Sequence, residues 1–218
     1  MEHVATHLRV AEAIRSAISD GDLAPGQRLI EADLAVSFGI SRGAVREVLL
    51  GLSHEGVLER IANRGARVRI VSIEEAIQVT EVRMVIEELC ARRAAELISD
   101  DEIVELRQLG EGLKQAVADL KPDDFGTLNH QLHERLIQIS AQSVAADVIS
   151  RLQARSVRYQ FKLSHRSGRP KQSLPHFLAI IEAVCARDSE AAASAVRVHL
   201  QSVIDLLRNE EQTRPSFV

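Results

Sequence analysis

The stretch FGISRGAVREVL, residues 38–49, predicts a helix with two different faces. Gly39 breaks the segment before it, and the side chain of Ser41 is suited to cap a new helix. The apolar residues recur at i, i+3, i+4 and i+7 and predict a buried face: Val45, Val48, Leu49 and Leu52. The N-terminal end lies off that face and is free to enter a major groove: Ser41, Arg42, Gly43 and Arg46. A helix N-terminus also favours phosphate, which suits DNA.

The sequence on either side predicts two more helices and a hairpin. HLRVAEAIRSAISDG, residues 7–21, places five apolar residues on one stripe: Leu8, Ala11, Ile14, Ala17 and Ile18. A Pro25-Gly26 turn leads to a short helix, EADLAVSF. VLERI and ARVRI predict strands joined at Gly65, and in the second strand Ala66, Val68 and Ile70 alternate with arginines as in a half-buried strand. Three helices and a basic hairpin predict a winged helix-turn-helix over residues 1–71.

The charge distribution fits DNA binding better than the total charge does. The whole chain carries a net charge of −4, yet residues 41–70 hold six arginines and three glutamates. Arginine forms bidentate contacts with phosphate and guanine. Beyond the recognition helix, four residues are candidates for contacts with the DNA backbone or minor groove: Arg28, Asn63, Arg64 and Gly65. The alternative is a small helical domain with an ordinary charged surface.

Residues 23–68, LAPGQRLIEADLAVSFGISRGAVREVLLGLSHEGVLERIANRGARV, resemble the DNA-binding domain of the GntR family of bacterial transcription regulators. The resemblance rests on the PG turn, the SR-x-x-VRE-x-L helix, the stop at Gly56 and the glycine-tipped wing. It implies that the third helix binds duplex DNA. Some relatives have a basic phosphate-contacting residue in the second helix, where this chain has Glu31, Ala32 and Asp33. Arg28 is a candidate to compensate for it.

The composition indicates a mostly α-helical protein of the cytoplasm. Aromatic residues make up only 3% of the chain and there is no tryptophan, while residues that favour helices dominate. Cys90 and Cys185 are far apart and form no CxxC pair, which favours a reducing compartment. No apolar run approaches the length of a membrane span, and the start MEHVATHLRV lacks the form of a signal peptide. We therefore expect a cytoplasmic protein without a membrane partner.

Residues 72–210 predict an all-α bundle of six helices, followed by a flexible tail at 211–218. Ser72 with Glu75, and Ser99 with Glu102, form capping boxes for helices at about 73–98 and 100–119. Two more helices are expected at about 124–140 and 143–164. Ser173 and Pro175 are expected to begin the fifth helix, and Asp188 to cap the sixth.

Histidines on three of these helices are candidate metal ligands. Asn129 and His133 are four residues apart on one helix face, and His176 and His199 lie on the last two helices. Imidazoles from three helices can converge inside a bundle on a divalent ion such as zinc, nickel or manganese. The alternative for each histidine is a surface position or a hydrogen-bonded core position. His130 is one step off the face that holds Asn129 and His133 and is interpreted as non-ligating.

The same segments resemble the FCD-type effector domain of the FadR subfamily of GntR regulators. NHQLHERL is similar to the family's Asp-x-x-Phe-His-x-x-Leu, and PHFLAIIEAVCARDSEAAASAVRVHL is similar to its histidine-containing ending. Six helices place the chain nearer the VanR-like branch. The resemblance implies that His133, His176 and His199 bind a metal ion, with Asn129 where many relatives have aspartate. It also implies that Arg83 holds an effector carboxylate.

A basic stripe on the fourth bundle helix offers further effector contacts. Arg151, Arg155, Arg158 and Lys162 recur at i, i+4, i+7 and i+11, and Tyr159 is the only tyrosine. Arg151, Arg155 and Tyr159 are the candidates to clamp a small carboxylate. The alternative is a solvated face that pairs with neighbouring acidic residues.

Together these features predict a homodimeric, metal-containing transcriptional regulator that binds a palindromic operator. We expect a repressor that is released when a small organic carboxylate binds at the metal. One alternative is a metal-dependent helical enzyme that acts on organic acids. The sequence has no HExxH or nucleophile motif, so we expect no enzyme. The other alternative is an architectural DNA-binding protein with a structural metal ion.

Overall fold

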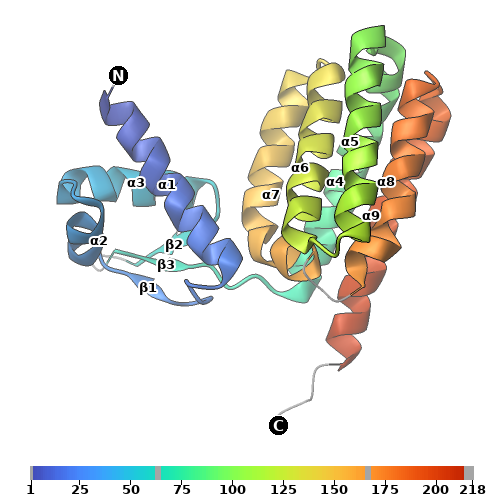
Figure 1. Cartoon of the computed structure of the whole chain (residues 1–218). Coiled ribbons are helices and arrows are strands. Elements are labelled where there is room, and N and C mark those ends of the chain that lie inside the picture. Colours follow the sequence, from blue (N-terminus) through green and yellow to red (C-terminus); the bar gives the residue numbers. More distant parts are fainter. Residues whose placement is uncertain (1, 62–64, 165–167, 214–218) are drawn as a thin grey trace. The chain divides into compact units, whose positions relative to one another are not determined.

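The computed structural model describes residues 2–61, 65–164 and 168–213, without the side chains of residues 2–5, 19–20, 154–164 and 210–213. The chain divides into two compact units, one of residues 1–72 with 151–162 and the other of residues 73–150 with 163–218 (Figure 1). The first is a helical unit with a small sheet, and the second is helical. This arrangement confirms the predicted fold class. No helix in the described part of the chain is long and apolar enough to span a membrane.

The first unit packs its helices around one apolar core. Its helices are α1 (Glu2–Asp20), α2 (Glu31–Phe38) and α3 (Arg42–His54). The α3 residues expected to be buried are buried, at 5% exposure or less: Val45, Val48, Leu49 and Leu52. On α1 the buried residues are Val10, Ile14 and Ile18, whereas Leu8 is 65% exposed. The expected α1 stripe was therefore wrong at Leu8, because the face that meets the core runs through Val10 instead.

The turn between α2 and α3 has the predicted local chemistry. Gly39 ends α2 in the left-handed conformation, with φ at 65°, and its N–H donates to carbonyl groups of the last turn. Ser41 caps α3, since its Oγ accepts a hydrogen bond from the backbone N–H of Ala44 at 3.1 Å. These two residues fix where the third helix begins.

A three-stranded antiparallel sheet completes the first unit. Its strands are β1 (Arg28–Leu29), β2 (Leu58–Arg60) and β3 (Ala66–Val68), in the order β1-β3-β2. Strand β1 was not predicted, because two residues are too short to show an alternating pattern. Strand β3 ends at Val68, so the predicted alternation does not reach Ile70, which is 63% exposed.

Gly65 is required by the packing of the sheet. Its φ is +86°, and a Cβ added there would lie 2.5 Å from the backbone oxygen of Leu29 in β1. No side chain fits so close to backbone, and few residues other than glycine adopt this φ. The glycine therefore allows the start of β3 to approach β1.

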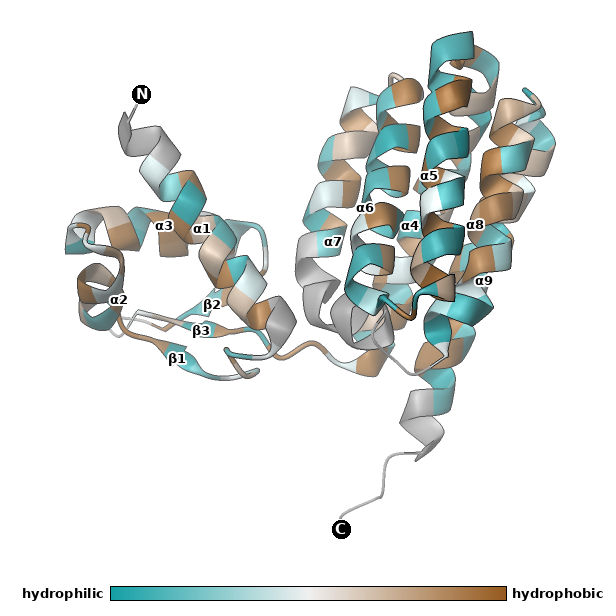
Figure 2. Ribbon diagram, in the orientation of Figure 1, coloured by the Kyte–Doolittle hydropathy of each residue, from teal (hydrophilic) through white to brown (hydrophobic). Residues whose placement is uncertain are grey.

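Six helices follow Ser72 in the part of the chain that the structure describes. They are α4 (Ile73–Leu97), α5 (Asp100–Ala118), α6 (Pro122–Ile139), α7 (Ser143–Ser164), α8 (Arg169–Cys185) and α9 (Ser189–Thr213). Figure 2 shows hydrophilic and hydrophobic bands alternating along them, as amphipathic helices require. The largest apolar cluster draws on α4, α5, α6, α8 and α9. Helix α7 packs through Ala145 and Ile149 against Cys90 of α4.

The start of α8 corrects a prediction. The helix begins at Arg169, not at Ser173, with Pro170 in its first turn and Pro175 inside it. Proline fits a first helical turn, and Pro170 takes that role. Pro175 has no backbone N–H, so α8 lacks one hydrogen bond next to His176, but the helix continues.

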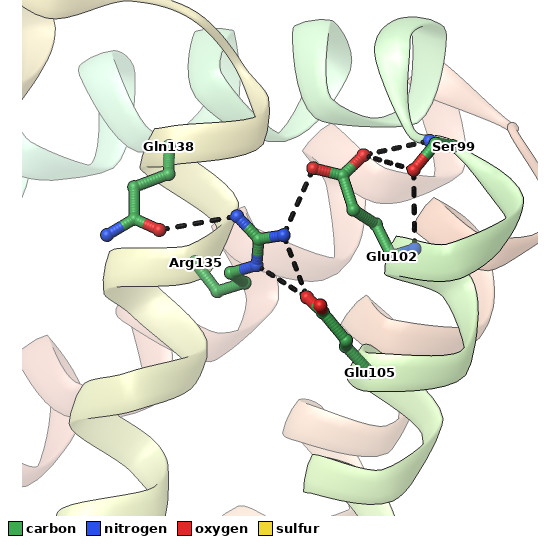
Figure 3. A network of polar contacts seen from close by, with 5 residues as sticks. All are labelled: Ser99, Glu102, Glu105, Arg135 and Gln138. Atoms are coloured by element: carbon green, nitrogen blue, oxygen red, sulfur yellow. Dashed lines mark hydrogen bonds and ion pairs between the residues drawn. The ribbon is translucent and has the colours of Figure 1, made fainter.

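The predicted cap of α5 is present and is tied to α6. Ser99 and Glu102 form a capping box, and Arg135 of α6 donates to Glu102 at 3.1 Å and to Glu105 at 2.9 Å (Figure 3). At α9, Asp188 Oδ1 accepts a hydrogen bond from the N–H of Ala191 at 2.9 Å, as expected of an N-cap. An open groove of about 460 Å³ runs beside Arg135 between α5 and α6. None of the predicted ligand-binding residues lines it.

Candidate functional site

The N-terminal end of α3 is an exposed basic surface on a buried support. Ser41, Arg42, Gly43 and Arg46 are all exposed, while Ala44 and Val45 beside them are buried. A Cβ added at Gly43 would meet nothing nearer than Ser41 Oγ at 3.8 Å. Packing therefore does not require a glycine at this position. The missing side chain leaves the α3 backbone open to a close approach by a ligand.

Arg46 is held by a carboxylate of α2. Its Nε lies 3.0 Å from Glu31 Oε1, and its Nη2 lies 2.7 Å from Glu31 Oε2. This is a bidentate pair. The hydrogen bond from Arg46 lowers the pKa of Glu31; burial opposes this shift, and the charges of Arg46, Arg60 and Arg42 add to it. The sequence analysis placed Glu31 in the second helix but did not foresee this contact.

The wing residues differ in their surroundings. Arg28 is exposed on β1, opposite Arg67 of β3 in the sheet register. Arg67 is paired with Glu59, its Nε 2.8 Å from Oε2. Gly65 has the packing role described above. Asn63 and Arg64, the other two predicted wing contacts, lie outside the described residues.

In the second unit, the three predicted histidines come together from α6, α8 and α9. The ring centres of His133 and His199 are 5.5 Å apart, and those of His176 and His199 are 6.2 Å apart. The buried ring of Phe177 lies between these helices, 4.5 Å from the centre of the His199 ring and 5.9 Å from that of His133. The cluster therefore has an apolar neighbour on this side.

A buried pair of polar contacts orients one of these histidines. Glu87 of α4 accepts from Arg83, whose Nε is 2.8 Å away, and contacts Nδ1 of His133 at 3.0 Å. The side chains of Arg83 and Glu87 are only 8% and 5% exposed. Burial raises the pKa of Glu87, but Arg83 and His133 outweigh it and lower this pKa to about 2. The contact occupies Nδ1 of His133, so Nε2 is the nitrogen that remains for another partner.

Two buried acceptor atoms in this region have no hydrogen-bond partner: Asn129 Oδ1 and His199 Nδ1. Buried polar atoms are nearly always satisfied, so both atoms are available to a bound water molecule or a ligand. Within the described residues, however, no three His, Cys, Asp or Glu side chains converge on one point as a metal ion requires. His133, His176, His199 and Asn129 carry the nitrogen and oxygen donors that a divalent metal binds, and two of these residues have an unpartnered acceptor atom. Their side chains do not, however, surround a single point.

The electrostatics keep two of the histidines neutral. Burial lowers the pKa of His199 well below its usual value; His133, Arg169 and His176 act in the same direction, against the charge of Glu87. Burial and the charge of Arg169 also lower the pKa of His176. A neutral imidazole is the form that binds a metal ion.

Arg169 is a residue that the sequence analysis did not single out. It is 6% exposed at the start of α8, and its Nη2 donates to Ser202 Oγ of α9 at 3.2 Å. A buried arginine beside two histidines is suited to an anion. The segment SHRSGRPKQS gave no periodic signal, so only the fold could place this side chain.

The remaining effector candidates are not joined to this cluster by any contact that the structure describes. Arg151 is exposed on α7. The side chains of Arg155 and Tyr159 lie outside the described residues. Arg83 belongs to the cluster through Glu87. His130, interpreted as non-ligating, lies on the exposed side of α6 with Nε2 3.3 Å from Glu134.

Comparison with known proteins matches both units to families. Residues 6–68 match the family described as bacterial regulatory proteins, gntR family, and residues 78–202 match the FCD domain. The chain is 30% identical over 190 residues to the HTH-type transcriptional repressor RspR of Escherichia coli K12, covering 87% of this chain and 83% of that protein. It is 27% identical over 182 residues to the Nta operon transcriptional regulator of Aminobacter aminovorans, covering 83% and 84%.

A solved structure has the same fold. The structure of E. coli McbR/YncC superimposes with a TM-score of 0.80, covering 94% of this chain and 98% of that one at 24% identity. The matched families and relatives are transcriptional regulators, not enzymes. This chain therefore belongs to the GntR family of DNA-binding transcriptional regulators and carries an FCD domain.

Proposed function

We propose that this regulator is a homodimeric repressor that a small organic carboxylate releases from a palindromic operator. The observation that carries this proposal is the pairing of two sites in one chain. One is an exposed arginine-bearing helix end, and the other is a buried cluster of histidines, Arg83 and Arg169 with unpartnered acceptor atoms. RspR is named a repressor, and this supports the proposal that the present chain represses transcription as well.

The DNA half of the proposal assigns base contacts to the N-terminal end of α3. Arg42 is exposed and Gly43 leaves the backbone open, so this end can enter a major groove. Arg42→Ala should weaken binding to a duplex enriched from a random-sequence pool by about tenfold to a hundredfold and relax base preference. Fluorescence anisotropy measures both. Unchanged affinity and preference would remove Arg42 from the interface.

An apolar strip on α4 supports the proposed homodimer. Val82, Val85 and Leu89 recur at i, i+3 and i+7 and are 50%, 68% and 45% exposed. A helix-turn-helix regulator that binds a palindrome needs two copies, and an exposed apolar helix face is suited to a second copy of this chain. Sedimentation of Val85→Glu, compared with the wild type, tests this assignment. A variant that remains as dimeric as the wild type would exclude the strip.

The sensing half assigns a divalent metal, with zinc as the first candidate, to His133, His176 and His199, with Asn129 as a fourth ligand. Rings on one ion have centres about 5 Å apart. The observed distances are 5.5 Å for His133 and His199 and 6.2 Å for His176 and His199. A bound ion would supply positive charge and an open position for an anion. Asn129 Oδ1 and His199 Nδ1 are unpartnered acceptors that such an ion would satisfy.

The effector is proposed to be a carboxylate because buried arginines accompany the histidines. Arg83 and Arg169 are 7% and 6% exposed, and guanidinium groups bind carboxylates in bidentate fashion. Arg83 is already paired with Glu87, so an effector that took Arg83 would also disturb the contact of Glu87 with His133. Helix α4, which carries both residues, begins directly after Ser72. An effector can change DNA affinity only by binding two conformations unequally, and α4 is the element proposed to differ between them.

His176→Ala tests the metal assignment, and His130→Ala is its matched control. His130 lies on the exposed face of α6 and contacts only Glu134 among the described partners. Metal content per protomer, measured by inductively coupled plasma mass spectrometry, should fall for His176→Ala and stay at the wild-type level for His130→Ala. Full occupancy in His176→Ala would remove that residue from the site.

Two alternatives have separate tests. A helical enzyme would consume organic acids, and a turnover assay with the metal-loaded protein would detect the product. An architectural protein with a structural metal would bind the enriched duplex with an affinity that no small acid changes. A panel of hydroxy acids, dicarboxylates, sugar acids and aromatic acids tests this in the anisotropy assay.

A further inference from the structure

The DNA-facing surface of the first unit has a carboxylate among its arginines. Glu31 is the first residue of α2, and its carboxylate is bound by Arg46. Arg42 and Arg60 are also close enough for their charges to lower the pKa of Glu31. Glu31 is therefore ionised at neutral pH, on a surface where each negative charge repels DNA phosphates.

The pair occupies the Nε–Nη2 edge of Arg46, one of the two guanidinium edges that can make a bidentate contact with DNA. Glu31 accepts from Nε and from Nη2 of the guanidinium, at 3.0 and 2.7 Å. A bidentate contact to guanine O6 and N7, or to a phosphate, requires two neighbouring N–H groups of one arginine. The same two N–H groups cannot serve Glu31 and a DNA acceptor together. Binding of Arg46 to DNA through this edge must therefore displace the carboxylate.

We propose that Glu31 is a specificity-determining residue that competes with DNA for Arg46. The proposal rests on the assignment of α3 as the DNA-contacting helix. On an unrelated sequence the contacts are mostly to phosphates, and release of Arg46 leaves the Glu31 carboxylate facing them. On the cognate sequence a bidentate base contact replaces the lost pair. Glu31 thus weakens binding to unrelated DNA more than binding to the operator.

Asp33 provides a matched control for charge. It lies in the same first turn of α2, is exposed, and carries the same charge, but it is not part of the Arg46 pair. Both acids favour the N-terminus of α2 through the helix dipole. Asp33→Asn therefore reports the removal of one negative charge from α2, and Glu31→Gln reports that same change together with the release of Arg46.

The experiment measures anisotropy of two labelled duplexes, one enriched from a random-sequence pool and one with the same bases shuffled, over a series of KCl concentrations. Glu31→Gln is expected to bind the shuffled duplex about tenfold tighter than the wild type, with a salt slope steeper by about 0.9. Its affinity for the enriched duplex should rise by much less, so the specificity ratio falls. Asp33→Asn should change both affinities by the same small factor.

An Arg46→Ala background sharpens the test. If Glu31 acts through Arg46, then Glu31→Gln should have no larger effect than Asp33→Asn once Arg46 is gone. Glu31→Asp, which keeps the charge but shortens the side chain by one methylene, serves as a second variant if Glu31→Gln does not fold. Glu31→Asp should also lower the specificity ratio, which compares the affinity for the enriched duplex with that for the shuffled duplex.

Several outcomes would overturn the inference. Equal behaviour of Glu31→Gln and Asp33→Asn on both duplexes would do so, as would a Glu31→Gln effect that persists without Arg46. A loss of affinity for the enriched duplex in Glu31→Gln would show that Glu31 positions Arg46 instead of competing for it. If the wild type enriches no duplex from the pool, the DNA assignment of α3 fails too, which separates that failure from a failure of Glu31 alone.

Discussion

Two arginine–glutamate pairs in this chain have the same chemistry and opposite surroundings. Arg46 and Glu31, in the first unit, have side chains that are 65% and 23% exposed. Arg83 and Glu87, in the second, are 8% and 5% exposed. An exposed pair contributes little to stability and exchanges its partners readily with solvent or a ligand. A buried pair cannot lose one partner without leaving an uncompensated charge in a low dielectric.

The difference separates two uses of arginine. At the end of α3 the guanidinium is available, and a DNA acceptor can replace the carboxylate that holds it. Beside the histidines the guanidinium is fixed, and it orients Glu87, which in turn contacts His133. The first arrangement suits a surface that must bind and release DNA. The second suits a pocket whose side chains must be in place before a ligand arrives.

The largest expected effect comes from breaking the buried pair. Arg83→Met should lower the free energy of unfolding by about 3 kcal/mol, because Glu87 then stays buried with only His133 beside it. Urea denaturation followed by circular dichroism measures the loss. The double variant Arg83→Met/Glu87→Gln should recover part of it, since the unpaired charge is gone.

Arg46→Met is the comparison for the exposed pair, and it should leave the denaturation midpoint unchanged. If Arg83→Met also unfolded at the wild-type midpoint, burial would not distinguish the two pairs.

A second prediction concerns the two exposed glycines of α3. Gly43→Ala and Gly51→Ala should each stabilise the first unit, by up to roughly 1 kcal/mol, because alanine favours a helix and neither position is crowded. Only Gly43→Ala should weaken operator binding, by about tenfold, since a methyl group at the helix end blocks close approach of the backbone to DNA. Thermal melts and anisotropy give the two readouts. Equal DNA affinity of the two variants would show that the backbone at Gly43 makes no close contact.

The smallest effect is expected at a half-buried pair that lies between the two extremes. Arg135 and Glu102 are 28% and 23% exposed. Hydrogen bonds from the backbone and side chain of Ser99 lower the pKa of Glu102 from 4.5, and Arg135 lowers it further. Glu102→Gln should therefore cost about 0.5–1 kcal/mol of stability at pH 7.

The pH dependence of this loss follows from the direction of the shift. A carboxyl with a lowered pKa in the folded state stabilises the fold above its unfolded pKa, and this stabilisation is lost as pH falls through the folded pKa. The difference in free energy of unfolding between wild type and Glu102→Gln should be constant at neutral pH and should disappear below about pH 4.5. Urea midpoints measured across acidic pH would detect it. A gap that stays open in acid would mean that the charge of Glu102 is not the cause.

Most of the elements could be predicted because their signals are local. The buried face of α3, the Ser41 cap, the Ser99–Glu102 capping box and the Asp188 cap each depend on residues within one or two turns. The errors also have local causes. Strand β1 is too short to have a period, and Pro175 imitates a helix start that Pro170 provides.

The partners of the functional side chains had no such local signal. The sequence put the three histidines on separate helices, but their approach to one another depends on how α6, α8 and α9 pack. The segment that holds Arg169 has no apolar period, and the burial of Arg169 next to Ser202 appears only when α8 meets α9. Glu87 was identifiable only as the residue four positions after Arg83.

The sequence alone thus determined which helices form and which of their faces are apolar, because periodicity and capping act between neighbouring residues. It also placed Arg42 and Arg46 at an uncovered helix end. Tertiary structure alone decided that Glu31 holds Arg46 across fifteen positions of chain, that Glu87 holds His133, and that Asn129 and His199 keep unpartnered acceptors. These contacts join residues distant in the chain, so only the packing of whole helices could set their distances and burial.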